Sequence, residues 1–168
     1  MNWDFLTAIL QTIQTLAVLI ALFYAWRQIQ EARRETHLGA MWEIYREISS
    51  DELNGARKVI IKNREKLLSL CNPGDIKKLP EDVRYAASKT GNHMNRIGYV
   101  VRKGLIPEDL LLDGYKYVIG RSWIILEPYI SCIREVRGEE SFMGDFEYIA
   151  KKVFQKYLSR DEIKTADY

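Results

Sequence analysis

The sequence predicts an all-α protein in which one N-terminal transmembrane helix extends into a cytosolic bundle of about four further helices. Two observations lead to this prediction. From Phe5 to Trp26 the chain runs for 22 residues without a charged side chain. Beyond that run, apolar residues recur three and four positions apart, as in an amphipathic helix, and no segment shows the alternation typical of a strand.

The uncharged run has the length of a membrane span. A helix rises about 1.5 Å per residue, so 22 residues cover about 33 Å, close to the ~30 Å hydrocarbon core of a bilayer. Trp3 lies at one end, and Tyr24 and Trp26 lie at the other. Aromatic side chains are enriched at both membrane interfaces, so the lipid bilayer is the first expected partner.

The charges that flank the run predict its orientation. Arg27, Arg33 and Arg34 follow it closely, whereas residues 1–4 contain no Lys or Arg. Basic residues beside a span tend to stay cytoplasmic. We therefore expect a single-pass protein of the plasma (inner) membrane, with its N-terminus outside and its C-terminal domain in the cytoplasm.

Two other interpretations of the run remain open. A cleaved signal peptide has a basic start, a short apolar core and small residues at the cleavage site, whereas this run ends in bulky residues around Ala25. A buried helix of a soluble fold is the second alternative, because Gln and Thr side chains make the run less apolar than a strong span.

The polar residues of the run share one face of the predicted helix. At 100° per residue, six polar or small residues fall within an arc of about 120°. They are Thr7, Gln11, Gln14, Ala17, Ala21 and Ala25. Polar groups in lipid favour protein partners, and small residues let helices approach closely. We expect self-association or pairing with another membrane protein through this face; a monomeric span and a glutamine-lined pore are the alternatives.

The chain divides into five predicted segments. They are a short extracytoplasmic N-terminus (1–4), the transmembrane helix (5–26), a cytosolic helical extension (27–49), a helical domain (50–158) and a polar tail (159–168) that we expect to be loose. The extension should continue the span as one helix, because no Pro interrupts it. About 140 residues remain beyond the span, enough for one compact core.

Capping signals predict the first helices of the domain. Ser49 and Glu52 have capping-box spacing, and the helix that they open should run to about Leu70. Pro80 should open the next helix, which runs to about Lys103.

Similar signals predict the last two helices. Pro107 should open a long helix that Gly138 closes. We expect Gly120 and Pro128 to kink or break it. A final helix should begin near Ser141.

Composition and motifs argue against several classes of function. Lys plus Arg is 25 and Asp plus Glu is 23, so the net charge of +2 predicts no nucleic-acid partner. Cys71 and Cys132 are far apart and are expected as reduced thiols. His37 and His93 lack partners at ligand spacing, and no phosphate-binding glycine motif is present, so no metal, cofactor or catalytic residue is predicted.

One segment gathers polar residues within a predicted helix. Asn92 and Arg96 are four residues apart and share a face, as do Asn95 and Tyr99. Two glycines in the same segment indicate close packing, since mid-helix glycine costs roughly 1 kcal/mol against alanine. The cluster is either a polar pocket for a ligand or anion, or a buried network that fixes helix register, with Arg96 paired to an acid such as Glu127.

A second cluster combines an aromatic residue with charges. It consists of Arg121, Trp123, Glu127 and Arg134. An aromatic side chain beside arginine is typical of a recognition surface. A core Trp with a flanking salt bridge explains the same pattern, and we favour that interpretation.

Three motifs follow the span in order: NxxNRIGYxVxxGLI at 92–106, SWxxLEPYI at 122–130 and FEYIAK at 146–151. With the N-terminal span, they resemble a family of small prokaryotic membrane-anchored helical proteins grouped as a domain of unknown function. The resemblance implies a helical cytosolic domain behind one span. It implies no activity and no catalytic residues.

The sequence therefore predicts a non-enzymatic, membrane-tethered helical interaction or sensor module that self-associates through its span. A cytosolic protein partner, or a small ligand near Asn92 and Arg96, would bind the helical domain. A small oligomeric channel or membrane-disrupting effector is the main alternative, and an enzyme of unrecognised type is a further one.

Overall fold

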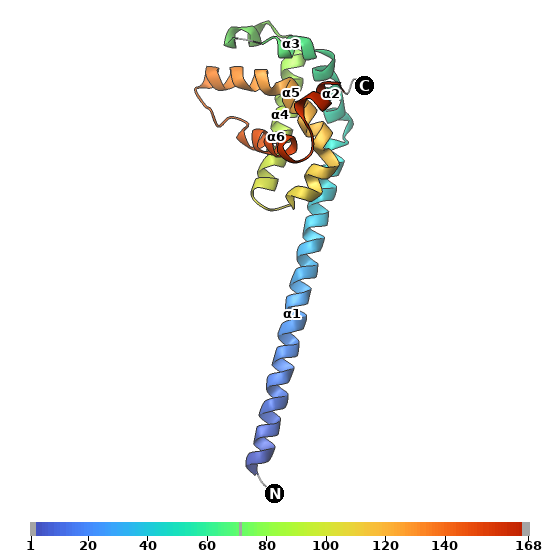
Figure 1. Ribbon diagram of the computed structural model, residues 1–168, viewed down its shortest axis with the longest axis vertical. Coiled ribbons are helices and arrows are strands. Elements are labelled where there is room, and N and C mark those ends of the chain that lie inside the picture. Colours follow the sequence, from blue (N-terminus) through green and yellow to red (C-terminus); the bar gives the residue numbers. More distant parts are fainter. Residues whose placement is uncertain (1–2, 71, 166–168) are drawn as a thin grey trace. The chain divides into compact units, whose positions relative to one another are not determined.

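The computed structural model describes residues 3–70 and 72–165, and within these ranges the chain is helical with no strand, which confirms the all-α prediction (Figure 1). Of the side chains in these ranges, those of residues 4–6, 8, 164 and 165 are not described. The chain forms two compact units, Met1–Ala40 and Met41–Tyr168. Cys71 lies outside the described residues, and Cys132 is buried.

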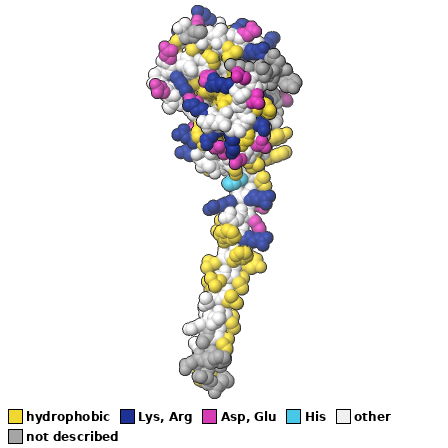
Figure 2. Space-filling view, in the orientation of Figure 1, with side chains coloured by type: hydrophobic (Ala, Val, Ile, Leu, Met, Phe, Trp, Pro, Cys, Tyr) yellow, Lys and Arg dark blue, Asp and Glu magenta, His cyan; other side chains and the backbone are white. Residues whose placement is uncertain are grey.

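Helix α1 runs without interruption over Trp3–Ile48, so the uncharged run and its charged extension form one helix as predicted. The first unit consists of α1 alone in the described residues. Within α1, an 18-residue window has a mean hydropathy of 1.7, and none of it is buried. In the space-filling view, hydrophobic side chains lie along the described part of this unit that precedes the first Lys and Arg side chains, beside other side chains and backbone (Figure 2).

The second unit begins with the last turns of α1 and contains six further helices and one 3₁₀ helix within the described residues. These are α2 (Asp51–Lys62), α3 (Arg64–Leu68), η1 (Pro73–Lys78), α4 (Glu81–Arg102), α5 (Glu108–Arg137), α6 (Gly144–Lys156) and α7 (Arg160–Thr165). Helix α4 packs on α2, α5 and α6, and α5 also contacts α3, α6 and α7. The core lies among these helices, with Phe146 fully buried.

The first helix of the domain differs from the prediction at both ends. Its N-cap is Ser50 rather than Ser49, since the Ser50 Oγ accepts a hydrogen bond from the Leu53 N–H at 3.3 Å. The predicted single helix to Leu70 is divided into α2 and α3 at Asn63. The Asn63 side chain donates to the Val59 carbonyl at 3.0 Å, and such local side-chain bonds compete with helix continuation.

Helix α5 is continuous through Gly120 and Pro128, so the break considered for this region does not occur. Gly120 serves packing instead. A Cβ atom built there would lie 2.4 Å from Cδ1 of Ile163 in α7. Tyr129 and Ile130, which follow the proline, are both buried, and tertiary packing of this kind offsets the hydrogen bond that proline removes.

The expectation of a loose tail after residue 158 is wrong for residues 160–165. These form α7, whose Ile163 is buried. Ser159 and Glu162 form a reciprocal cap, because the Ser159 Oγ accepts from the Glu162 N–H at 3.1 Å and the Glu162 carboxylate accepts from the Ser159 N–H at 2.6 Å. The Ser-x-x-Glu spacing of this capping box is present in the sequence and predicts a helix start, which the expectation of a loose tail overlooked.

The two glycines of α4 mark close helix contacts, as predicted. A Cβ at Gly91 would lie 2.6 Å from Sδ of Met143, and one at Gly98 would lie 2.1 Å from the carbonyl oxygen of Asp145. The first neighbour is the end of a flexible side chain, whereas the second is backbone. Helix α6 therefore begins against a surface of α4 that only glycine leaves free (Figure 1).

We predict that Gly98→Ala lowers the free energy of unfolding by roughly 1–3 kcal/mol, because the new methyl group forces the backbone at Asp145 to move. Gly114→Ala in α5 is the matched control. Apart from its own helix, no described residue comes within 4 Å of a Cβ there, so this change should stabilise the fold by roughly 0.5–1 kcal/mol. Denaturant unfolding of both variants in mild detergent, followed by circular dichroism, measures the two effects. Equal stability of the two variants would contradict the predicted contact.

Candidate functional site

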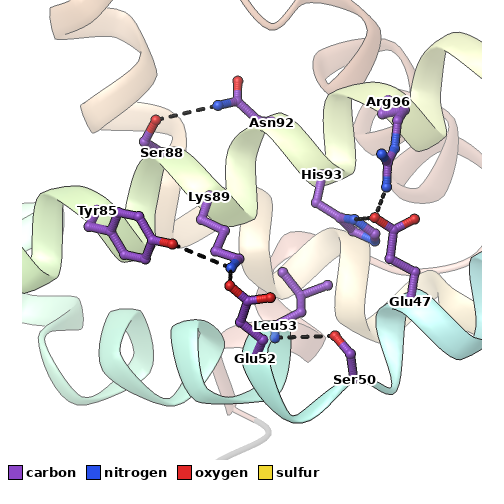
Figure 3. Close-up of a pocket in the computed structure, with 10 residues that line it drawn as sticks. All are labelled: Glu47, Ser50, Glu52, Leu53, Tyr85, Ser88, Lys89, Asn92, His93 and Arg96. Carbon is purple, nitrogen blue, oxygen red and sulfur yellow. Dashed lines mark hydrogen bonds and ion pairs between the residues drawn. The ribbon is translucent and has the colours of Figure 1, made fainter.

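A cavity of about 520 Å³ lies between the end of α1, α2 and α4. Ten residues line it, and Figure 3 shows their side chains: Glu47, Ser50, Glu52, Leu53, Tyr85, Ser88, Lys89, Asn92, His93 and Arg96. The α4 residues recur at three- and four-residue spacing, so they lie along one face of that helix. The opposite wall comes from the turn that joins α1 to α2. Two residues of the predicted polar pocket, Asn92 and Arg96, lie in this cavity.

Ion pairs join the two walls of the cavity. Arg96 pairs with Glu47, and Lys89 pairs with Glu52 (Figure 3). The expected partner of Arg96 was Glu127, but that carboxylate instead accepts a hydrogen bond from Arg160 at 3.0 Å. The sequence offered no way to rank these acids, since Glu47 and Arg96 are brought together only by tertiary structure.

His93 lies at the base of this ionic network. Its side chain is 7 % exposed, and its Nδ1 lies 3.2 Å from Oε1 of Glu47. Burial, and then the positive charge of Arg57, lower the pKa of His93 to about 4, so the imidazole is neutral at physiological pH. Glu47 favours the protonated form, but it also pairs with Arg96, whose charge opposes this effect. The buried Nε2 of His93 has no hydrogen-bond partner among the described residues.

The cavity presents two carboxylates, two cations, an amide and a neutral imidazole. These groups could bind a small polar ligand whose own charged groups replace one partner of each ion pair. No group of three or more His, Cys, Asp or Glu side chains in the described ranges is arranged to hold a metal ion.

Asn95 and Tyr99, the other two residues of the predicted pocket, lie elsewhere. The Asn95 Oδ1 accepts hydrogen bonds from the N–H groups of Asp145 and Phe146, both at 3.1 Å. Asn95 thus caps α6 from a neighbouring helix, a role that Met143 at the N-cap position does not fill. Tyr99 is exposed, with its ring 5.7 Å from Nζ of Lys103.

The second predicted cluster separates into different environments. Trp123 is 4 % exposed and meets the ring of Phe146 edge-on at 5.0 Å, which confirms the core interpretation. Arg134 pairs with Glu147 at 2.8 Å and donates to the Phe142 carbonyl at 2.9 Å. Glu127 pairs with Arg160, and Arg121 lines a groove between α2 and α5.

The predicted interface residues of α1 are all exposed within the first unit. They are Thr7, Gln11, Gln14, Ala17, Ala21 and Ala25. The Thr7 hydroxyl donates to the Trp3 carbonyl at 2.9 Å, a local bond that satisfies this side chain within the helix. Association through this face remains a prediction, since the structure holds a single chain.

The fold and the cavity define a class of protein: a helical domain that follows one long, uncovered apolar helix. The chain belongs to the family described as Domain of unknown function (DUF4760), which it matches over residues 12–153. The match begins within the apolar part of α1 and ends within α6, so it includes both units. This confirms the expected membership of a family of unknown function. The comparisons with curated proteins and with solved structures gave no match.

We predict that His93 makes stability depend on pH. Its pKa in the folded chain, about 4, lies below the ordinary value of 6.5, so the unfolded chain binds the extra proton between these values. The resulting contribution is fully present above pH 6.5 and is lost as the pH falls towards 4. The loss should be on the order of 2–3 kcal/mol. Denaturant unfolding between pH 7.5 and 4.5, compared with His93→Gln, isolates this contribution from other acidic titrations.

The matched control is His37→Gln, which removes the other histidine of the chain. If the wild type and His93→Gln lose stability in parallel through this pH range, His93 is not the buried neutral group described above.

Proposed function

We propose that the chain is a single-pass, membrane-tethered helical interaction or sensor module that self-associates through its span. The observation that supports this proposal best is that none of the apolar window of α1 is buried by the described residues. A core helix of a soluble protein buries such a window. Here Leu10 is 64 % exposed, Leu16 58 % and Leu22 61 %.

Exposure of these apolar side chains to water costs free energy through the hydrophobic effect. Removing a Leu or Ile side chain from water is worth roughly 1.5–3 kcal/mol, and the apolar run contains many such residues. A contiguous exposed apolar surface of this extent is typical of a protein or membrane contact. A bilayer covers all sides of a single helix, and the backbone of α1 is internally hydrogen-bonded as hydrocarbon requires.

The ends of the run support the same arrangement. Trp3 and Trp26 are exposed, as residues of an interfacial belt are. Arg27 begins the charged part of α1 and pairs with Glu31 at 3.1 Å. With Arg33 and Arg34 nearby, the positive-inside rule favours a cytoplasmic second unit.

Self-association follows from the polar face of α1. Gln11 and Gln14 are exposed, and their amides would meet hydrocarbon in a monomeric span. Interhelical hydrogen bonds in membranes contribute about 0.6–2 kcal/mol each, and Ala17 and Ala21 would allow the close approach that such bonds need. The second unit, which has its own core, would then be presented at the inner leaflet in two or more copies.

We predict that Leu16→Arg moves the protein out of the membrane fraction, because an arginine at the centre of a span costs about 2.5–3.5 kcal/mol on insertion scales. Leu38→Arg is the matched control, since Leu38 is also exposed but lies beyond the uncharged run. Alkaline carbonate extraction followed by immunoblotting measures the distribution. Wild-type protein in the extracted fraction, or equal behaviour of the two variants, would contradict membrane insertion.

We predict that Gln11→Leu combined with Gln14→Leu converts the wild-type oligomer to a monomer by removing hydrogen bonds from the interface. The control is Thr12→Val with Thr15→Val, which removes two polar groups outside the 120° arc. Cross-linking and blue-native electrophoresis in mild detergent report the species. An unchanged species in the glutamine variant would show that this face makes no contact.

A further inference from the structure

A second hollow, of about 280 Å³, lies between α2 and α5, away from the cavity described above. Its walls come from one face of each helix. The lining residues are Asn54, Arg57, Lys58, Ile60 and Ile61 of α2, and Tyr117, Val118, Arg121, Ser122 and Ile125 of α5. We call this hollow the α2–α5 groove. It belongs wholly to the second unit.

The charges of the α2–α5 groove all have one sign. Arg57, Lys58 and Arg121 line it, and no Asp or Glu of the described ranges does. None of the three forms an ion pair within the described residues. Arg121 also borders a neighbouring cavity where Glu65 lies, and no ion pair joins them.

Other basic residues at helix contacts of the second unit do find acids. Lys89 pairs with Glu52 across α2 and α4, and Arg102 pairs with Asp145 at 3.0 Å across α4 and α6. The three cations of the α2–α5 groove have no such partner among the described residues. Such a concentration of unpaired positive charge at a hollow attracts an anion.

Arg57 carries one buried donor that no described residue satisfies. Its guanidinium donates to Oδ1 of Asn54, but its Nη1 is buried and has no hydrogen-bond partner among the described residues. Burial lowers the pKa of Arg57. A guanidinium has five N–H donors, and leaving buried donors unpaired is costly.

The remaining walls restrict the chemistry of the missing partner. Ile60, Ile61, Val118 and Ile125 supply an apolar side, and the Ser122 and Tyr117 hydroxyls supply neutral donors. A phosphate monoester carries a charge of about −1.5 to −2 and three acceptor oxygens, which match several cations better than a singly charged carboxylate does. The volume of the groove, about 280 Å³, lies close to the lower limit of about 300 Å³ that is usual for small-molecule pockets. This favours a compact ligand.

We propose that the α2–α5 groove binds the phosphate group of a small phosphate monoester. The apolar part of this ligand would pack on the apolar side of the groove. Arg57, Lys58 and Arg121 would hold the phosphate oxygens, with the arginines as forked donors. The same phosphate chemistry occurs in soluble esters and in the headgroup of phosphatidic acid, and these two sources are separated by experiment below.

The test is isothermal titration of the full chain, in dodecyl maltoside and a phosphate-free buffer, with phenyl phosphate. We expect saturable binding that is tighter than for inorganic phosphate or for benzoate. Arg121→Gln and Lys58→Gln should each weaken it roughly tenfold or more, as expected for loss of a charge-assisted hydrogen bond. Lys62→Gln is the control, because it removes one exposed charge from α2 outside the groove.

A second readout distinguishes the groove from diffuse surface binding. Arg57 is one of the two causes that lower the pKa of His93. The other charged groups of the cavity that His93 lines are Glu47, Glu52, Lys89 and Arg96. A dianion beside Arg57 offsets that charge, so saturating phenyl phosphate should raise the pKa of His93, measured by NMR titration of its ring protons. Circular dichroism melting confirms that each variant is folded.

No saturable binding of phenyl phosphate at millimolar concentration would overturn the proposal. So would an equal loss of affinity in Lys62→Gln and in the groove variants. In nanodiscs, competition by phosphatidic acid but not by phosphatidylcholine would identify a lipid source of the phosphate. Undiminished phenyl phosphate binding in phosphatidic acid nanodiscs would identify a soluble one.

Discussion

The apolar surface of α1 must be kept away from water, and the proposed biology of the chain depends on this constraint. Side chains such as Leu16 and Leu22 project on all sides of a helix that has no neighbour in the first unit. A protein core covers one face of a helix, whereas lipid covers every face. The aromatic residues at the ends of the run, and the arginines that begin at Arg27, are where a bilayer would place them.

Within the second unit, α4 organises the structure through two different faces. One face carries Gly91, Asn95 and Gly98 and holds the start of α6 by close approach and by capping. The other carries Lys89, Asn92, His93 and Arg96 and forms a wall of the ionic cavity. The density of polar residues in this segment therefore has two causes: the capping of α6 and the ionic network of the cavity.

Much of the fold was predictable because its signals are local. The uncharged run, the prolines that open α4 and α5, and Gly138 with φ 64° at the end of α5 all act within a few residues. The capping box that starts α7 is equally local and was overlooked, because the polar composition of the tail masked one buried isoleucine.

The site was only partly predictable because its partners are remote in sequence. Arg96 meets Glu47, and Asn95 meets the backbone of Asp145, through contacts that no spacing rule describes. The α2–α5 groove was missed for the same reason. Arg57 and Lys58 lie more than sixty residues from Arg121, and only the packed helices show that no carboxylate of residues 3–70 and 72–165 lines the groove.

The most direct test of the central claim is the depth of α1 in a bilayer. A nitroxide placed by single-cysteine labelling at Leu16 or Leu38, in a chain carrying Cys71→Ser and Cys132→Ala, reports collisions with oxygen and with a water-soluble nickel chelate in liposomes. An inserted α1 predicts that the label at Leu16 meets oxygen and is shielded from nickel, while the label at Leu38 is open to nickel. Equal nickel access at both positions would contradict a membrane span.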